Sequence, residues 1–461
     1  MKLIIFDTLT GKKCEFIPIN EKKISMYVCG PTVYDFSHIG NARPIIVFDT
    51  LFRLLKSIYG DNNVSYVRNI TDIDDKIITA ANQKNISTEE LVRKTINYFH
   101  EDIDALNVLD PTFEPKATET IPEMISMISG LIKKNFAYVA ENHVLFDTDS
   151  SKEYGKLSKR STKDMIAGSR VEVAPYKKNP FDFVLWKPSK KNEPAWDSPW
   201  GKGRPGWHIE CSAMTKKFLG ISFDIHAGGA DLIFPHHENE IAQSESLHSN
   251  LFVKYWMHNG YLNIEGEKMS KSVGNIITIR ELLKDYEGEI LRFAMLSTHY
   301  RQPINFSKEL LESSNKQLNK IYKSLNLRMI DDEFKHDSIP ESLLDDMNTP
   351  LAISEIHELV KSLNDESLSD KEWVKIKSRI KYYGKLMGLF GLTSEEWFEK
   401  KQKKISVEKR EEIEKLIKKR NLARQNKNFK LADEIRENLK KKGVLVEDIN
   451  TESIWKLIDE Q

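Results

Sequence analysis

Cysteine is scarce in this chain of 461 residues: only Cys14, Cys29 and Cys211 are present. Three thiols cannot form a disulfide framework, so a small disulfide-stabilised secreted fold is excluded and a reducing compartment is expected. Long apolar runs are also missing, and no stretch suits a membrane span. The N-terminal residues reach Asp7 too early for a signal peptide. We therefore expect a cytoplasmic protein with no membrane partner.

An excess of charge of either sign is absent as well. The chain has 69 Lys and Arg against 69 Asp and Glu, which gives a formal net charge of zero. Zero net charge does not exclude a nucleic-acid partner, but any attraction to phosphate must then come from local patches. The length is too great for a single core and predicts two to four domains.

Alternating strand and helix patterns occupy the N-terminal part of the chain. Residues 24–30 form an apolar run typical of a buried strand, and residues 43–58 repeat apolar side chains at helical spacing. Residues 64–70 indicate a second strand, which ends at the polar string TDIDDK (71–76). Parallel strands deliver functional groups at their carboxyl ends. The pattern therefore predicts a parallel α/β sheet with site residues at that edge.

Between about residues 115 and 205 this pattern is interrupted. A helical pattern, a hairpin-like stretch at 137–147 and a segment rich in Lys, Pro and Trp follow one another, and we interpret them as an insertion. Strand and helix signals then resume, with a strand at 223–226, a tight turn at Gly228–Gly229 and a helix from Pro235 onward.

Beyond residue 306 the strand signals fade, and amphipathic helical patterns continue to about residue 398. The predicted fold class is α/β: a Rossmann-like parallel-sheet catalytic domain (1–305) with the insertion, an all-α helical bundle (306–400) and a small basic C-terminal domain (401–461). Residues 401–446 hold 16 Lys and Arg against 7 Asp and Glu. Such an excess suits a nucleic-acid partner, although a charge run alone more often marks a solvated helical face.

The string HIGN (38–41) falls where the first strand passes into a helix. Backbone N–H groups at a helix start favour phosphate, and Gly40 lets a flat adenine approach the backbone. The His38 imidazole can donate a hydrogen bond to oxygens that gain charge during phosphoryl chemistry. In isolation, an incidental His in a surface turn explains this string equally well.

About 230 residues later, the string KMSKS places Lys268 and Lys271 in a stretch flanked by glycines. Two ammonium groups suit a pyrophosphate leaving group. Alone, a basic loop is the better explanation. Together with His38, the string predicts an ATP site, with Mg²⁺ accompanying the nucleotide.

Four residues have zinc-ligand chemistry: Cys29, Cys211, His236 and Glu240, the last two spaced i, i+4 for one helix face. The cysteines lie 182 residues apart, so a zinc finger is excluded and a metal would have to join distant elements. On spacing alone, two buried structural thiols remain the more frequent arrangement. The string HHENE (236–240) is not His-Glu-x-x-His, which excludes a metalloprotease of that type.

The HIGN and KMSKS strings resemble the HIGH and KMSKS motifs of class I aminoacyl-tRNA synthetases. Further strings are similar to the cysteinyl-tRNA synthetase family specifically: YVCGPTVYD (27–35), NITDIDDK (69–76), PGWHIECSAM (205–214) and FPHHENE (234–240). One departure is Asn41, where the motif has a second His. Asn can still donate to a phosphate oxygen, so we expect a modest effect on rate.

The resemblance implies ATP-dependent activation of L-cysteine to cysteinyl-adenylate and its transfer to the 3′ end of tRNA(Cys). It implies one Zn²⁺ per chain, which would take the substrate thiolate as a fifth ligand and so select cysteine over serine, a pair that packing alone separates by only about 10²-fold. The implied roles are catalysis by His38, Asn41, Lys268 and Lys271, further ATP contacts from Gly40, Gly229 and Asp231, cysteine contacts from Thr71, Trp207 and His226, and metal ligation by Cys29, Cys211, His236 and Glu240.

His208, His226 and His237 could also hold the ligands in orientation as hydrogen-bond partners. In the basic segment, Arg420, Arg424 and Arg436 lie within a helical pattern, and Trp455 offers a stacking surface for a base. The resemblance implies that Arg424, Arg436 and Trp455 contact the anticodon. The family has Gly-Thr shortly before this Trp, whereas Glu452–Ser453 stand here.

We expect a monomer. A paralogue that passes cysteine to a small amine would not need the helical and basic C-terminal third, and a catalytically dead regulator would not need a complete Lys268–Ser272 motif and zinc set.

Overall fold

The computed structural model describes residues 2–159, 174–268, 276–328, 330, 338–403, 407–426, 428–442, 444–449 and 452–457. The chain divides into two compact units. The first comprises Met1–Ile279, Met295–Asn305 and Ile339–Ala352, and the second comprises Arg280–Ala294, Phe306–Ser338 and Ile353–Gln461. The domain limits expected at 305 and 400 stay predictions. No helix among the described residues is long and apolar enough to cross a bilayer.

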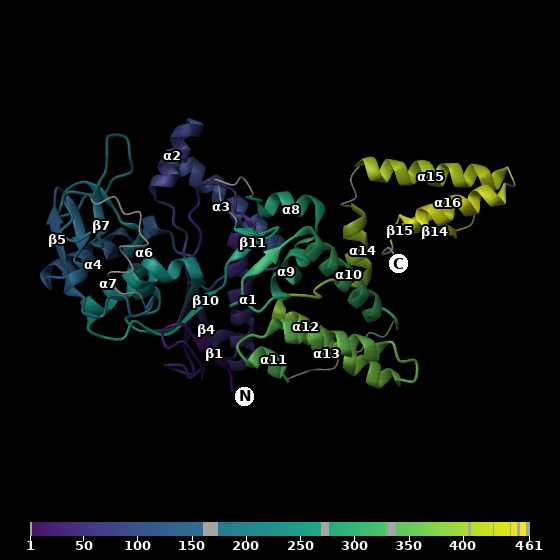
Figure 1. The fold of residues 1–461 in the computed structure, drawn as a ribbon, viewed down its shortest axis with the longest axis horizontal. Coiled ribbons are helices and arrows are strands. Elements are labelled where there is room, and N and C mark those ends of the chain that lie inside the picture. The colour runs from purple at the N-terminus through teal and green to yellow at the C-terminus, as the bar shows by residue number, and fades with distance from the viewer. Residues whose placement is uncertain are drawn as a thin grey trace. The chain divides into compact units, whose positions relative to one another are not determined.

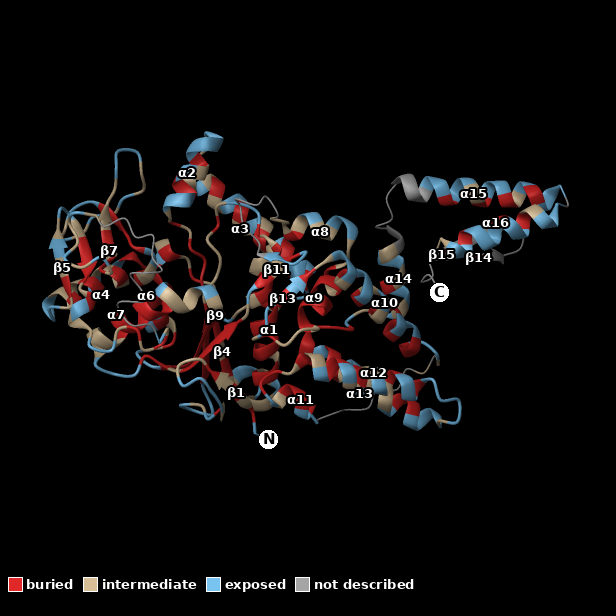
Figure 2. Ribbon diagram, in the orientation of Figure 1, coloured by how far each residue is buried: buried red, intermediate tan, exposed pale blue. Residues whose placement is uncertain are grey.

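A four-stranded parallel sheet forms the centre of the first unit, in the order β10-β9-β3-β4. Its strands are β3 (Ile24–Val28), β4 (Val64–Arg68), β9 (Phe223–Gly229) and β10 (Val253–Asn259). Figure 2 shows this sheet mostly in red, and every residue of β3 is buried. Burial on both faces explains why β3 appears in the sequence as a largely apolar run. The predicted strands β3, β4 and β9 are confirmed, and β3 and β4 each end two residues earlier than expected.

The tight turn predicted at Gly228–Gly229 is wrong. Both glycines continue β9, where Gly228 pairs with His258 and Gly229 pairs with Asn259 of β10. A neighbouring strand distant in sequence supplies these hydrogen-bond partners, so the glycines extend the ladder. The chain turns one residue later, in the short 3₁₀ helix Ala230–Leu232.

Helix α1 (Ile39–Tyr59) packs against the sheet and contributes a long run of buried residues. It contains the helix predicted at 43–58 and begins four residues earlier. The backbone N–H of His38 donates to Asn41 Oδ1 at 3.1 Å, which satisfies one group at the helix start. The HIGN string is therefore the N-terminal turn of this helix.

The insertion contains its own antiparallel sheet in the order β5-β6-β7-β8. The predicted hairpin is confirmed as β5 (Ala137–Ala140) and β6 (His143–Phe146), and β7 (Phe183–Pro188) and β8 (Gly203–Pro205) extend it. Three helices lie beside this sheet and share its core cluster (Figure 1): α4 (Ile121–Lys133), α6 (Trp207–Phe218) and α7 (Glu238–His248).

The remaining elements of the first unit are small. Antiparallel strands β1 (Ile4–Asp7) and β2 (Lys12–Glu15) precede the sheet, and helices α2 (Asp75–Lys84) and α3 (Thr88–Ala105) follow β4. A three-stranded sheet in the order β12-β11-β13 consists of β11 (Leu262–Ile264), β12 (Glu267–Lys268) and β13 (Ile304–Phe306). The short helix α11 (Glu341–Leu344) completes the unit.

The second unit is helical before its C-terminal part, as predicted for residues 306–398. Its helices are α8 (Ile279–Asp285), α9 (Gly288–Leu296), α10 (Lys308–Leu325), α12 (Thr349–Leu363), α13 (Asp370–Met387) and α14 (Ser394–Lys403), and one end of α8, α9 and α12 is assigned to the first unit. Beyond them, α15 (Val407–Gln425) and α16 (Phe429–Lys441) pack on an antiparallel hairpin, β14 (Val444–Ile449) and β15 (Glu452–Leu457).

Candidate functional site

The four predicted metal ligands meet at the carboxyl end of the central sheet. Cys29 directly follows β3, and Cys211 lies on α6. His236 belongs to a wide π-helical turn (Ile233–His237) that leads into α7, where Glu240 lies in the first turn. This edge is where parallel α/β sheets bind ligands.

The distances among the four side chains suit one metal ion. The two Sγ atoms are 3.9 Å apart, Cys29 Sγ lies 3.8 Å from Glu240 Oε1, and His236 Nε2 lies 3.1 Å from the same oxygen. One ligand atom from each of the four falls within 4.8 Å of every other. A tetrahedral zinc site with Zn–S bonds of about 2.3 Å requires sulfurs about 3.8 Å apart. The geometry therefore fits zinc.

A second set of four residues has ligand atoms within the same distance of one another: Cys29, His226, His237 and Glu240. In this set both histidines already hold hydrogen bonds. His226 Nε2 lies 2.9 Å from Glu240 Oε2, and His237 Nδ1 lies 2.8 Å from His258 Nε2. The set with two thiols also offers the softer donors, which zinc prefers. The set with two thiols is the one that the sequence predicted, and its role in metal binding stays a prediction.

Burial favours the uncharged forms of the side chains in this cluster. Burial raises the pKa of Cys29 well above its ordinary value, and the hydrogen bond and charge of Cys211 add to the effect. Burial also raises the pKa of Glu240 and lowers the pKa of His236 well below its usual range. Ionised thiols and a carboxylate are unfavourable in such surroundings unless a positive ion compensates them.

A layer of histidines surrounds the ligands. His237 Nε2 lies 3.4 Å from Cys29 Sγ, and its Nδ1 contacts His258, whose Nδ1 lies 2.8 Å from the Thr8 hydroxyl. If the Thr8 hydroxyl donates to His258, each ring in turn donates through Nε2, and the last N–H points at the Cys29 sulfur. Sequence reasoning named His237 but missed His258 and Thr8. No local pattern marks them, because they reach the site through β10 and the turn after β1.

The candidate cysteine-binding residues surround this cluster. The ring of Trp207 stacks on the His236 ring with centroids 4.1 Å apart, and Trp207 remains 39% exposed. Thr71 is buried after β4, and its hydroxyl lies 3.2 Å from Glu210 Oε2. Burial raises the pKa of Glu210 well above its ordinary value and so favours the neutral form of this side chain. Sequence reasoning missed Glu210.

His226, a predicted cysteine contact, lies against Glu240. Its side chain is fully buried, and Nε2 contacts the Glu240 oxygen on the side away from His236. The structure thus places His226 beside one of the predicted metal ligands, and its contact to the substrate stays a prediction.

The residues after the KMSKS string pair with the backbone around the HIGN string. Ile39 N–H donates to Ile277 O at 2.9 Å, and Ile279 N–H donates to Ser37 O at 2.9 Å, so the chain that follows the KMSKS string pairs with the residues around His38. Lys268 ends β12, while its side chain and the whole of Lys271 lie outside the described residues.

Gly40 lies in the first turn of α1, Gly229 ends β9, and Asp231 is exposed just beyond. A Cβ atom at Gly229 would lie 2.3 Å from Asp231 Oδ1, so this position requires glycine while Asp231 keeps its orientation. These groups and His38 are distributed over the carboxyl edge of the sheet and the start of α1.

In the C-terminal part, Arg424 and Arg436 are exposed on α15 and α16. Trp455 pairs with Val446 in the hairpin, and its side chain lies outside the described residues. Arg420, by contrast, is only 3% exposed and donates from Nη1 to Ser453 Oγ at 3.0 Å. The position where the family has Thr thus keeps a hydroxyl that serves packing.

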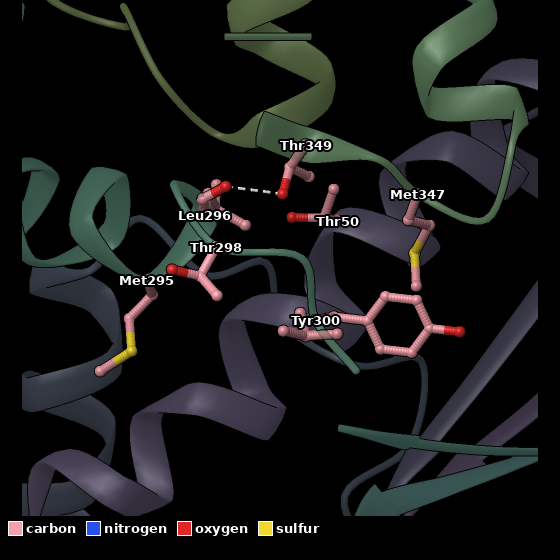
Figure 3. A pocket seen from close by; sticks show the side chains of 8 residues that line it. Thr50, Met295, Leu296, Thr298, Tyr300, Met347 and Thr349 are labelled. Carbon is pink, nitrogen blue, oxygen red and sulfur yellow. Dashed lines mark hydrogen bonds between the residues drawn. The ribbon is translucent and has the colours of Figure 1, made fainter. Parts of the chain in front are cut away.

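A small cavity elsewhere in the first unit is unsuited to a substrate (Figure 3). Its volume of about 10 Å³ admits roughly one water molecule. Thr50, Thr298 and Thr349 supply hydroxyls to its wall, and Thr349 Oγ1 donates to Leu296 O at 2.6 Å.

Three family models match the chain. "tRNA synthetases class I (C) catalytic domain" covers residues 15–316, "DALR domain" covers 339–392, and "Cysteinyl-tRNA ligase anticodon binding domain" covers 408–455. A cysteine–tRNA ligase from Pelagibacter ubique is 49% identical over 460 residues, which are 99% of each chain. One from Paramagnetospirillum magneticum is 50% identical over 99% of this chain and all of its own. The chain belongs to the cysteine–tRNA ligases.

Solved structures agree with this family at the level of the fold. Methionyl-tRNA synthetase of Mycobacterium tuberculosis aligns with a TM-score of 0.54 at 15% identity, covering 79% of this chain and 89% of its own. LeuRS of Agrobacterium radiobacter K84 aligns with a TM-score of 0.56 at 10% identity, covering 81% and 84%. The predicted family and the Rossmann-like fold class are both confirmed.

Proposed function

We propose that this cysteine–tRNA ligase activates L-cysteine with ATP at the carboxyl edge of its central sheet and transfers it to the 3′ end of tRNA(Cys), with one Zn²⁺ selecting the substrate thiol. The observation that carries the proposal is the cluster of Cys29, Cys211, His236 and Glu240 at the carboxyl edge of the central sheet, on which α1 packs with the HIGN string at its N-terminus.

The chain's own residues would define the metal site as follows. Cys29, Cys211, His236 and Glu240 would hold the ion, which when bound favours a thiolate strongly over an alkyl hydroxyl as a further ligand. The N–H of His237 would stabilise the Cys29 thiolate at 3.4 Å. Trp207 would cover the ligand ring of His236 and exclude water from that side. Serine has no thiol to ionise, so the site would reject it without a proofreading step.

Adenylation needs positioning rather than a general base. A carboxylate oxygen of cysteine attacks the α-phosphorus of ATP, the new O–P bond forms, and the bond to pyrophosphate breaks. We assign stabilisation of the developing charge to His38 and Asn41 on α1 and to Lys268 and Lys271 after β11, with Mg²⁺ bound to the nucleotide. Because Asn41 Oδ1 accepts from the His38 backbone, its amide NH₂ is the end available to a phosphate oxygen.

The remaining contacts follow from position. Gly40 would let adenine approach α1, and Gly229 with Asp231 would meet the ribose at the end of β9. Thr71 would bind cysteine beside the buried Glu210 side chain, to which its hydroxyl donates at 3.2 Å. Exposed Arg424 and Arg436, with Trp455, would contact the anticodon, a role that the match to the anticodon binding domain supports. We propose a cytoplasmic monomer.

The test is charging of total tRNA with radiolabelled cysteine in the presence of excess unlabelled serine, before and after zinc removal with a chelator. We expect charging that survives serine, falls in the metal-free protein and returns with added zinc. Charging inhibited by modest serine excess would refute the metal-based selection. Absence of charging would refute the proposed activity, and cysteine-dependent pyrophosphate exchange would then locate the failing step.

A further inference from the structure

Arg43 is a buried guanidinium on α1 with only backbone oxygens for partners. It is 1% exposed, and no carboxylate among the described residues forms an ion pair with it. Nη1 donates to Gly260 O at 2.9 Å and to Tyr261 O, and Nη2 donates to Tyr300 O at 3.3 Å and to Gln302 O. Burial lowers the pKa of Arg43 to about 10, so it stays charged at neutral pH. A buried cation without a counter-ion is costly and calls for a reason.

The four carbonyls belong to two segments that meet under the three-stranded sheet. Gly260 and Tyr261 connect β10 to β11, and Tyr300 to Gln302 lead into β13. Gly260 N–H donates to Tyr300 O at 2.8 Å. A Cβ atom at Gly260 would lie 2.7 Å from Arg301 O, so the two segments are in direct backbone contact. The fork of Arg43 therefore fastens both segments to α1 at one point.

These hydrogen bonds hold the start of β11, whose partner strand β12 ends at Lys268 of the second ATP motif. β11 pairs with β12, with Asn263 opposite Lys268. Arg43 lies five residues after His38 on the first turns of α1. The far side of the motif is held to the same helix start, because Thr278 forms a backbone bridge with His38. Helix α1 therefore carries one motif and anchors the flanks of the other.

We infer that Arg43 is a positioning residue for adenylation, which sets the distance between the His38 turn and the β11–β12 strands that lead to Lys268. The inference rests on the proposed function of these two motifs. Arg presents a rigid fork of donors, whereas Lys presents one compact ammonium, so Lys cannot hold both segments at once. A displacement of about 1 Å in a catalytic group can reduce a rate by about 10²-fold.

The experiment compares Arg43→Lys and Arg43→Gln with wild type in cysteine-dependent ATP–pyrophosphate exchange. Rates are normalised to active sites titrated by the burst of cysteinyl-adenylate, so that unfolded protein does not contribute. We expect kcat per site to fall by about 10-fold in R43K and about 100-fold in R43Q, while zinc content and the KM for cysteine stay near wild type.

Arg53 provides the matched control on the same helix. It donates to Asp49 Oδ2 at 2.8 Å and to Asn107 O at 2.7 Å, away from both ATP motifs. Arg53→Gln should lower the melting temperature without changing kcat per site. Arg43 variants with wild-type kcat per site would overturn the inference. If R43Q does not fold, R43K decides alone. Absence of exchange in the wild type would instead refute the proposed function.

Discussion

His226 is either a contact to the substrate cysteine or a support for a metal ligand, and we predict the second role. Its Nε2 lies 2.9 Å from Glu240 Oε2, and both side chains are fully buried. A hydrogen bond to a charged group contributes about 1.5–3 kcal/mol. Since about 1.4 kcal/mol corresponds to a factor of ten, removing the donor should weaken zinc binding roughly 10- to 100-fold, the range usual for outer partners of metal ligands.

The assay is zinc competition against a chromophoric chelator, combined with pyrophosphate exchange across a range of zinc concentrations. His226→Leu removes the donor, and His226→Gln restores an N–H that can reach Glu240. We expect weak zinc binding in the first variant and near-normal binding in the second. At saturating zinc, the KM for cysteine should return to the wild-type value in both.

A different outcome would refute this reasoning. If H226L binds zinc normally but keeps a raised KM for cysteine at every zinc concentration, then His226 contacts the substrate, as the motif resemblance alone implies. His357, which is half-buried and bonded to Gln317 in the helical unit, serves as the control. Its change to Gln should leave both zinc affinity and the KM for cysteine unchanged.

Three further predictions concern other parts of the chain. A Cβ at Gly30 would lie 1.7 Å from Asn69 O, so Gly30→Ala should separate β3 from β4, displace Cys29 and reduce zinc content, measured by metal analysis beside an unaffected Gly391→Ala. Burial tends to raise the pKa of Glu114. Hydrogen bonds from His100 and Arg68 outweigh burial and lower this pKa below its ordinary value. Its stabilisation is therefore present above about pH 4.3 and lost as pH falls through the lower folded pKa. Urea unfolding of Glu114→Gln should show a loss of roughly 3 kcal/mol at pH 7 that shrinks in acid, and an equal loss at both pH values would exclude the ion pair. Changing Arg424 and Arg436 together to Glu should lower kcat/KM for tRNA at least about 10-fold with unchanged pyrophosphate exchange, since like charge repels phosphate; equal loss of both activities would argue against a separate tRNA surface.

Elements with strong local patterns could be predicted from sequence. Runs of mostly apolar residues predict the buried strands β3 and β4, and helical periodicity predicts helix α1. The predicted ends lie within a few residues of the observed ends. The end of β9 could not be predicted in this way. Its two glycines signal a turn locally, and pairing with β10 outweighs that signal. Strand β8 of the insertion has only three residues, beginning with Gly203 and ending with Pro205. These residue types do not predict a strand, so pairing with β7 is what makes this segment a strand.

The candidate site divides in the same way. Residue type and the i, i+4 spacing make His236 and Glu240 candidate metal ligands, and the resemblance to the family implies that role for them. The positions of His258, Thr8 and Glu210 could not be predicted, because each arrives on an element whose neighbour is far away in the chain.

The amino-acid sequence by itself determined the family and predicted the two ATP motifs and the metal ligands, because these depend on side-chain type and short spacing. Only the tertiary structure decided that Cys29 and Cys211, 182 residues apart, come within 3.9 Å, that His226 stands behind Glu240, and that Arg43 joins the supports of both motifs. Such contacts depend on sheet order and packing between distant segments. No local pattern encodes them.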